Sequence, residues 1–141
     1  MKLFLIALLA ALAIALAADL PSSEILQPKD VAARLAGKDA KPAVFQVGPN
    51  VMYRSNHITG SIFAGPGSKP EGLELLKSEV SKFSKDREII LYCGCCPWDK
   101  CPNMNPAIKV LKEMGYTRVK AMHIPENFKK DWIDQGYPVE Q

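Results

Sequence analysis

The chain has 141 residues and a formal net charge of +3, with basic and acidic residues scattered along it. No run of like charge is longer than Lys129-Lys130, and aromatic residues do not alternate with the basic ones. This composition argues against a nucleic-acid partner, which would require a basic patch or stripe. The length supports one domain with a core of its own.

The chain opens with a hydrophobic segment. Lys2 is followed by sixteen apolar residues, 3–18, which end in small residues before Asp19. This order is typical of a secretory signal peptide, so we expect residues 1–18 to be removed and the mature protein to be periplasmic or secreted. An uncleaved anchor is the alternative, although sixteen residues fall just short of the roughly 17 to 25 of a spanning helix. After cleavage we expect no membrane span.

Residues 19–27 are predicted to be a short linker, and amphipathic helices follow it. Pro28 stands at a typical first helical position and Gly37 at a typical helix end. A later helix is bounded more sharply, with Asn105 as predicted N-cap, Pro106 in its first turn and Gly115 after its end. Apolar residues at spacings of three and four support each of these helices. The predicted helices cover residues 28–36, 71–83, 105–114 and 126–135.

Three short apolar runs are predicted to be buried strands, at residues 43–47, 88–92 and 117–122. Residues 48–69 between the first two strands are rich in Gly, Pro, Asn and Ser and are predicted to be mostly irregular. Strands that alternate with helices at this spacing indicate an α/β fold with a mostly parallel central sheet and helices on both faces. We expect residues 28–141 to form this single domain.

All four cysteines fall within nine residues, directly after the strand at 88–92. Any disulfide among them would close eight residues or fewer, so it would constrain the unfolded chain little. A loop between a strand end and a helix start favours thiolate over thiol, because the helix N-terminus carries partial positive charge. We therefore predict that the chemistry of the protein lies here. The four residues are Cys93, Cys95, Cys96 and Cys101.

The order of four segments resembles the rhodanese-like (sulfurtransferase) family. They are the strand at 43–47, the sequence His57-Ile58-Thr59-Gly60-Ser61, the strand that delivers Cys93, and Trp132 followed by residues 136–140. The resemblance implies a parallel α/β sheet and an active loop whose backbone N–H groups, near Gly94, surround the nucleophile. It also implies that Cys93 carries sulfane sulfur as a persulfide.

The loop departs from the family pattern. It is about six residues longer than the usual loop, it contains three extra cysteines, and its only cation is Lys100. Gln46 and Gly48 stand where the family often has an acidic residue and an arginine. These departures weaken the case for thiosulfate as the sulfur donor.

Three roles for Cys95, Cys96 and Cys101 are compatible with the sequence. They could be resolving thiols that attack a Cys93 persulfide or sulfenate. They could bind a soft metal such as Cu(I) or Zn(II), although a single crowded loop is unlike a closed zinc site. They could instead form a disulfide that fixes the loop, from Cys101 to Cys95 or Cys96.

The predicted function is that of an exported sulfurtransferase or thiol-persulfide relay that uses Cys93 and the three nearby cysteines. We expect a small sulfur-containing substrate or thiol acceptor, no cofactor and no resident metal; the sequence names no protein partner. Substrate-binding candidates are Gly94, Trp98, Lys100 and His123, whereas His57 is predicted to be structural. The alternatives are a soft-metal binding module and a catalytically inert interaction domain.

Overall fold

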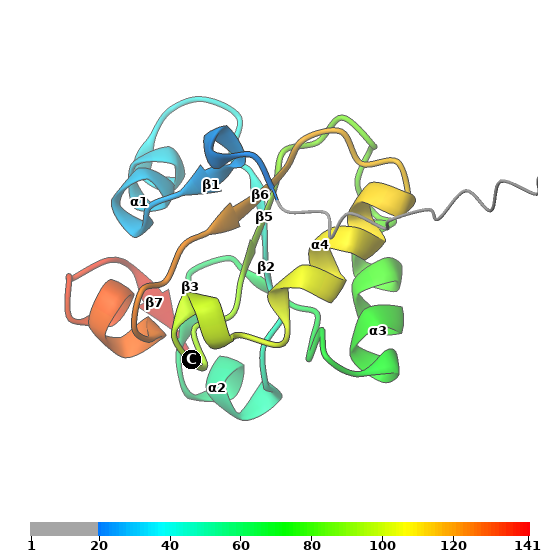
Figure 1. The fold of residues 1–141 in the computed structure, drawn as a ribbon. Helices are drawn as coiled ribbons and strands as arrows, with labels where there is room; N and C mark the ends of the chain where they lie inside the picture. Colours follow the sequence, from blue (N-terminus) through cyan, green and yellow to red (C-terminus); the bar gives the residue numbers. More distant parts are fainter. Residues whose placement is uncertain (1–19) are drawn as a thin grey trace, which may run out of the picture.

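The computed structural model describes residues 20–141, which form a central sheet flanked by helices (Figure 1). The predicted signal peptide, residues 1–18, lies outside these residues. Between residues 20 and 141, no helix combines the length and the apolar character that crossing a bilayer demands.

The central sheet has five parallel strands in the order β1-β6-β5-β2-β4. The middle strand, β5, pairs with β2 on one side and with β6 on the other, so Leu91 lies between Phe45 and Ala121. Parallel strands place their carboxyl ends at the same edge, and the cysteine loop leaves the sheet at that edge. The strands are β1 (Ile25–Leu26), β2 (Ala43–Gln46), β4 (Ile62–Phe63), β5 (Ile89–Tyr92) and β6 (Val119–Met122).

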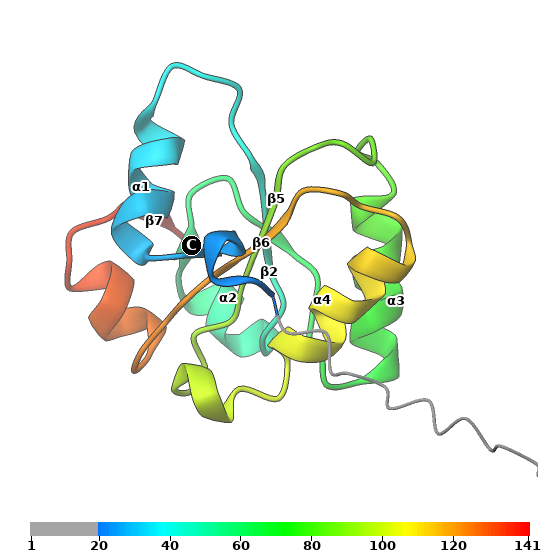
Figure 2. The same ribbon diagram turned by 45° about the horizontal axis from the view of Figure 1, so that its top comes forward.

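A smaller sheet pairs β3 (His57–Ile58) with β7 (Val139–Glu140) in antiparallel register. Helix α1 lies on one side of the central sheet, whereas α3 and α4 lie together on the other (Figure 2). The helices are α1 (Pro28–Ala36), α2 (Asn50–Ser55), α3 (Pro70–Val80) and α4 (Met104–Glu113). Short 3₁₀ turns occur at Ser22–Glu24 and Trp98–Lys100, and a π-helical turn at Lys129–Ile133.

The core lies on both faces of β5, because successive side chains of a strand point to opposite faces. Ile89 and Leu91 pack with Leu111 of α4 in one cluster, whereas Ile90 packs with Trp132 in the other. All five side chains are fully buried. A strand that is apolar on both faces is typical of a parallel sheet covered by helices. The predicted α/β fold, with helices on both faces, is therefore confirmed.

Several predicted boundaries were wrong. Strand β1 lies within the predicted linker, and α2 interrupts the segment predicted to be irregular. The predicted helix at 126–135 is only a π-helical turn, Lys129–Ile133. Before the turn, the Asp131 carboxylate accepts the backbone N–H groups of Glu126 and Asn127, which caps its start.

Candidate active site

The cysteine loop begins with a sharp turn at Gly94. Cys93 directly follows β5, and Gly94 has a φ of +78°, a conformation that residues with a side chain rarely adopt. A Cβ atom on Gly94 would lie 2.6 Å from Cβ of Phe128, whose backbone N–H donates to the Gly94 carbonyl at 3.1 Å. This glycine therefore lets the chain turn toward α4 while it stays packed on the core.

The turn brings three thiols together. The Sγ atoms of Cys93, Cys95 and Cys101 all lie within 4.8 Å of one another. The Cys93 thiol lies 3.2 Å from Sγ of Cys95, which is in turn 3.0 Å from Sγ of Cys96. All four cysteines are free thiols in this structure. The predicted catalytic cysteines are thus brought together, with Cys96 outside the group of three.

Cys93 is enclosed by protein on several sides. Its side chain is 3% exposed. The Asn103 amide donates to its sulfur at 3.4 Å. Gly48, two residues after the neighbouring strand β2, lies against the sulfur from another side, since a Cβ atom there would lie 2.8 Å from Sγ. One hydrogen-bond donor and one glycine therefore shape the surroundings of this thiol.

Asn103 is a site residue that was not predicted from the sequence. It is 3% exposed and bridges two loops, because its Oδ1 accepts the Ser68 backbone N–H at 3.0 Å while Nδ2 reaches Sγ of Cys93 and of Cys95. Helix α4 begins one residue after it, so Asn103, and not Asn105 as predicted, is the N-cap residue. Its side chain makes no capping bond. The only signal in the sequence was a polar residue between the last cysteine and the helix.

The thiols differ in acidity. A hydrogen bond from the Cys93 thiol, together with the backbone N–H groups of Asn103 and Met104, lowers the pKa of Cys101 to about 6. The same contact with Cys101, and to a lesser extent burial, raises the pKa of Cys93. Burial and the hydrogen bond with Cys95 raise the pKa of Cys96 to about 12. Near neutral pH the negative charge of the cluster therefore rests on Cys101.

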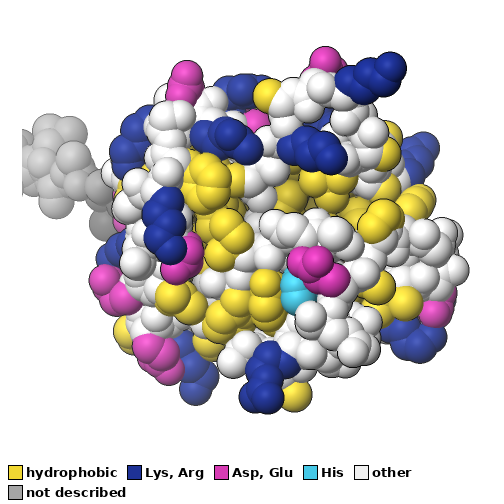
Figure 3. All heavy atoms as spheres, turned by 180° about the vertical axis from the view of Figure 1, so that it is seen from behind, with side chains coloured by type: hydrophobic (Ala, Val, Ile, Leu, Met, Phe, Trp, Pro, Cys, Tyr) yellow, Lys and Arg dark blue, Asp and Glu magenta, His cyan; other side chains and the backbone are white. Residues whose placement is uncertain are grey.

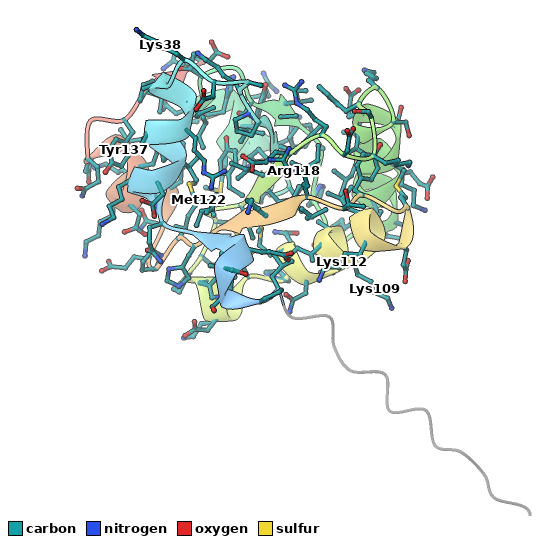
Figure 4. The ribbon with its side chains drawn as sticks, turned by 90° about the horizontal axis from the view of Figure 1, so that it is seen from above. Lys38, Lys109, Lys112, Arg118, Met122 and Tyr137 are labelled. Carbon is teal, nitrogen blue, oxygen red and sulfur yellow. The ribbon has the colours of Figure 1, made fainter. Side chains whose placement is uncertain are left out.

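A pocket of about 240 Å³ opens beside Cys101. Trp98 forms part of its wall, and Asp99 contributes a carboxylate. Among the residues that the structure describes, no lysine or arginine lines it; Lys109 and Lys112 project outward from α4 (Figure 4). The complete lining is Leu20, Ile25, Trp98, Asp99, Cys101, Met104, Asn105 and Ile108.

The remaining predicted residues lie around this pocket or away from it. Lys100 is exposed at the end of the 3₁₀ turn. The His123 ring lies 5.2 Å from the Trp98 ring, and its buried Nδ1 has no hydrogen-bond partner among residues 20–141. His57 instead stacks on Tyr53, with its ring nitrogens against the Tyr53 carbonyl and the Glu140 carboxylate. These contacts confirm that His57 packs and forms hydrogen bonds within the fold.

A larger cavity, about 590 Å³, lies between α1 and the β3–β7 pair and contains no cysteine. Its lining is mostly alanine, leucine, isoleucine and proline, with Lys29 and Lys41 among its residues. From behind, apolar patches of the surface are bordered by lysine and arginine side chains (Figure 3). Reactive side chains are concentrated in the cysteine loop, so the smaller pocket is the candidate active site.

Comparison with models of known protein families identifies the family of this chain. The family model described as "Rhodanese-like domain" matches residues 27–124, which is more than half of the chain. The chain belongs to the rhodanese-like family. The resemblance inferred from the sequence is thus confirmed, and the strand before Cys93 and the helix after the loop fall within the matched region.

Solved structures agree with this rhodanese-like fold. The BH2092 protein of Bacillus halodurans superposes with a TM-score of 0.65 at 22% identity, covering 84% of this chain and 77% of that one. The Alr3790 protein of Anabaena sp. gives a TM-score of 0.63 at 18% identity, over 82% and 90% of the two chains. A protein of Lactobacillus plantarum gives 0.60 at 13%, over 84% and 89%. No curated protein matched by sequence.

Proposed function

We propose that this rhodanese-like protein is a sulfurtransferase or thiol-persulfide relay that carries sulfane sulfur on Cys93. The observation that supports it best is the enclosure of the Cys93 sulfur, which accepts a hydrogen bond from the Asn103 amide. This donor can stabilise the anion of a persulfide at this position. Burial at 3% exposure would protect the persulfide from competing thiols in solution.

In the proposed cycle, the Cys93 sulfur attacks the outer sulfur of a donor R–S–SH, the S–S bond of the donor breaks and R–SH leaves. An acceptor thiol later removes the sulfur from the Cys93 persulfide. The acceptor thiolate attacks the outer sulfur of the persulfide, the S–S bond breaks, and Cys93 leaves as a thiol after it takes up a proton. Cys95 lies 3.2 Å from Cys93, so it is placed to act as an internal acceptor.

The test is intact-protein mass spectrometry of the reduced chain before and after incubation with polysulfide, followed by peptide mapping of residues 88–109. We expect one added sulfur atom on Cys93 that cyanide removes, and no such adduct in Cys93→Ser. A wild-type protein that gains no sulfur on Cys93 would refute the proposal. Full transfer activity in Cys93→Ser, lost in Cys95→Ser or Cys96→Ser, would move the nucleophile elsewhere.

A second candidate function is soft-metal binding, and one observation favours it. The three Sγ atoms within 4.8 Å of one another could serve as ligands for Cu(I), which prefers thiolates. The metal content of anaerobically purified protein tests this candidate. Stoichiometric copper in the wild type, lost when Cys93, Cys95 and Cys101 are all changed to serine, would support it, whereas metal-free protein that transfers sulfur would reject it.

We further propose that the protein is exported, on the basis of the apolar segment before Asp19. Protein recovered from the periplasm or medium should begin at Ala18 or Asp19 when its N-terminus is sequenced. A start at Met1 would contradict cleavage and would favour an uncleaved anchor.

A further inference from the structure

The two central thiols differ in their access to small molecules. Cys93 is 3% exposed, whereas Cys101 is only partly buried and lines the 240 Å³ pocket. Cys93 is absent from that lining. A donor molecule bound in the pocket would therefore meet the Cys101 sulfur first, although Cys93 holds the position that carries sulfur in the proposed function.

The pocket also limits what kind of donor fits. Six of its eight lining residues have apolar side chains, Ile25, Trp98 and Ile108 among them, although the surface open to the pocket is more polar than apolar, and its one carboxylate is that of Asp99. A dianion such as thiosulfate would be repelled by Asp99 and would find no cationic side chain in the lining. An uncharged alkyl or aryl group would instead bury apolar surface there.

The distance between the two thiols suits direct transfer of one sulfur atom. An S–S bond is about 2.05 Å long, so a sulfur in line between two others separates them by about 4.1 Å. The Sγ atoms of Cys101 and Cys93 lie within 4.8 Å of each other. A sulfur atom bound to Cys101 can thus reach Cys93 without a large movement of the loop.

We propose that Cys101 is the entry nucleophile of the site, that the adjoining pocket binds an apolar organic persulfide, and that Cys101 passes its sulfane sulfur to the buried Cys93. This inference rests on the proposed function of Cys93 as the sulfur carrier, and it adds the route of entry and the class of donor.

Both steps balance without an added oxidant or reductant. In the first, the Cys101 thiolate attacks the terminal sulfur of R–S–SH, the S–S bond of the donor breaks, and R–S⁻ leaves. The leaving thiolate takes the proton of the new persulfide, which gives Cys101–S–S⁻ and R–SH. In the second, the Cys93 sulfur attacks the outer sulfur while its proton moves to Cys101, which gives Cys93–S–S⁻ and Cys101–SH. The Asn103 amide then faces the product sulfur.

The experiment loads the reduced full-length mature chain with benzyl persulfide and locates the added sulfur by rapid alkylation and peptide mapping. We expect wild type to carry it on Cys93, Cys93→Ser to retain it on Cys101, and Cys101→Ser to load Cys93 at least about tenfold more slowly. Serine is nearly isosteric with cysteine, and trapping on Cys101 in Cys93→Ser does not depend on how Cys101→Ser folds.

The outcomes separate the two proposals. If Cys101→Ser loads Cys93 at the wild-type rate, or if Cys93→Ser holds no sulfur on Cys101, the entry role is overturned while the carrier role stands. If wild type gains no sulfur on Cys93 from either benzyl persulfide or polysulfide, the proposed function itself fails.

The charge of the pocket gives a second readout. Asp99→Asn should raise the rate with thiosulfate relative to benzyl persulfide by roughly three- to tenfold, because it removes the one carboxylate of the lining. Asp134→Asn is the matched control, since it removes the same charge from an exposed site beside Lys129. An unchanged preference in Asp99→Asn, or an equal change in both variants, would overturn the assignment of the pocket as the donor site.

Discussion

The side-chain amide of Asn103 donates a hydrogen bond to the buried sulfur of Cys93 at 3.4 Å. The same amide is fixed from the other side, because its Oδ1 accepts the Ser68 backbone N–H at 3.0 Å. Through this bond, the loop before α3 fixes the orientation of the Asn103 amide, which points at Cys93, the proposed sulfur carrier. In the proposed function, Asn103 positions and stabilises the Cys93 persulfide.

Replacing Asn103 by aspartate should separate its contact with Ser68 from its contact with Cys93. The carboxylate keeps an acceptor for Ser68, but it removes the donor to Cys93 and places a negative charge beside the sulfur. We expect the rate of persulfide formation on Cys93 to fall by about tenfold or more, because a charge-assisted hydrogen bond contributes roughly 1.5 to 3 kcal/mol. Stopped-flow loading with polysulfide measures this rate.

Asn56→Asp is the control for the change of amide to carboxylate, since the Asn56 amide contacts only the Ser55 hydroxyl, at 3.5 Å and near the surface. Its loading rate should equal that of the wild type. If Asn103→Asp loads as fast as Asn56→Asp, the Asn103 amide has no part in stabilising the persulfide.

How much of this site could be predicted from the sequence depends on the kind of contact. The grouping of Cys93, Cys95 and Cys101 followed from their closeness in the chain. The role of Asn103 did not, because it depends on Ser68, which lies 35 positions away. The different exposure of Cys93 and Cys101 also arises from tertiary packing, by Gly48 on one side and by the pocket walls on the other.

The same distinction holds for the fold. The strand at 89–92 was predictable because both of its faces are apolar, and Gly115 correctly marked a helix end, where it has a φ of +87°. Strand β1 has only two residues, Ile25–Leu26, and exists because it pairs with β6. No local periodicity can indicate so short a strand. Helix α2, with six residues, is likewise too short to show an apolar face.

Gly94→Ala should destabilise the protein more than Gly60→Ala, a substitution at a glycine with a similar φ. Gly94 and Gly60 have φ of +78° and +79°, but only at Gly94 would the new Cβ meet another atom, 2.6 Å from Cβ of Phe128. We expect Gly60→Ala to lower the free energy of unfolding by about 1 kcal/mol, and Gly94→Ala by about 3 kcal/mol, since a steric clash adds to the backbone strain. Urea denaturation measures both. Equal losses would mean that Gly94 is needed for its backbone conformation alone.

Gly48→Ala should slow loading of Cys93 because the added methyl group would lie 2.8 Å from its sulfur and 3.0 Å from Nε2 of Gln46. The space that the outer sulfur of a persulfide needs would be partly filled, so we expect a fall in rate of roughly tenfold. Gly37→Ala is the control, because its nearest atom would be 3.5 Å away, an ordinary contact. A normal loading rate in Gly48→Ala would show that the persulfide extends in another direction.

The reactivity of Cys101 should depend on pH in a way that distinguishes it from the other thiols. Because only the thiolate is alkylated, a pKa lowered to about 6 predicts that iodoacetamide modifies Cys101 at half its maximal rate near pH 6, with a plateau by about pH 7 to 8. Cys96, whose pKa is raised to about 12, should react slowly throughout this range. Peptide mapping after timed alkylation gives both rates. A midpoint near the ordinary thiol value, about 8.5, would contradict the proposed thiolate.

The same pKa links the stability of the fold to pH. An acid whose folded pKa lies below its unfolded pKa binds fewer protons when folded, so its contribution to stability is fully present above the unfolded pKa. For Cys101 this contribution should fall as the pH decreases from about 9 toward 6 and be absent below 6. Between pH 6 and 8 the Cys93 thiol stays protonated in the folded state, because its folded pKa is raised, and mostly protonated in the unfolded state, where a thiol has a pKa of about 8.5. It therefore offsets little of the effect. Urea denaturation of wild type and Cys101→Ser at pH 6 and pH 8 should therefore give a smaller difference at pH 6, and a difference that does not change with pH would exclude a thiolate on Cys101.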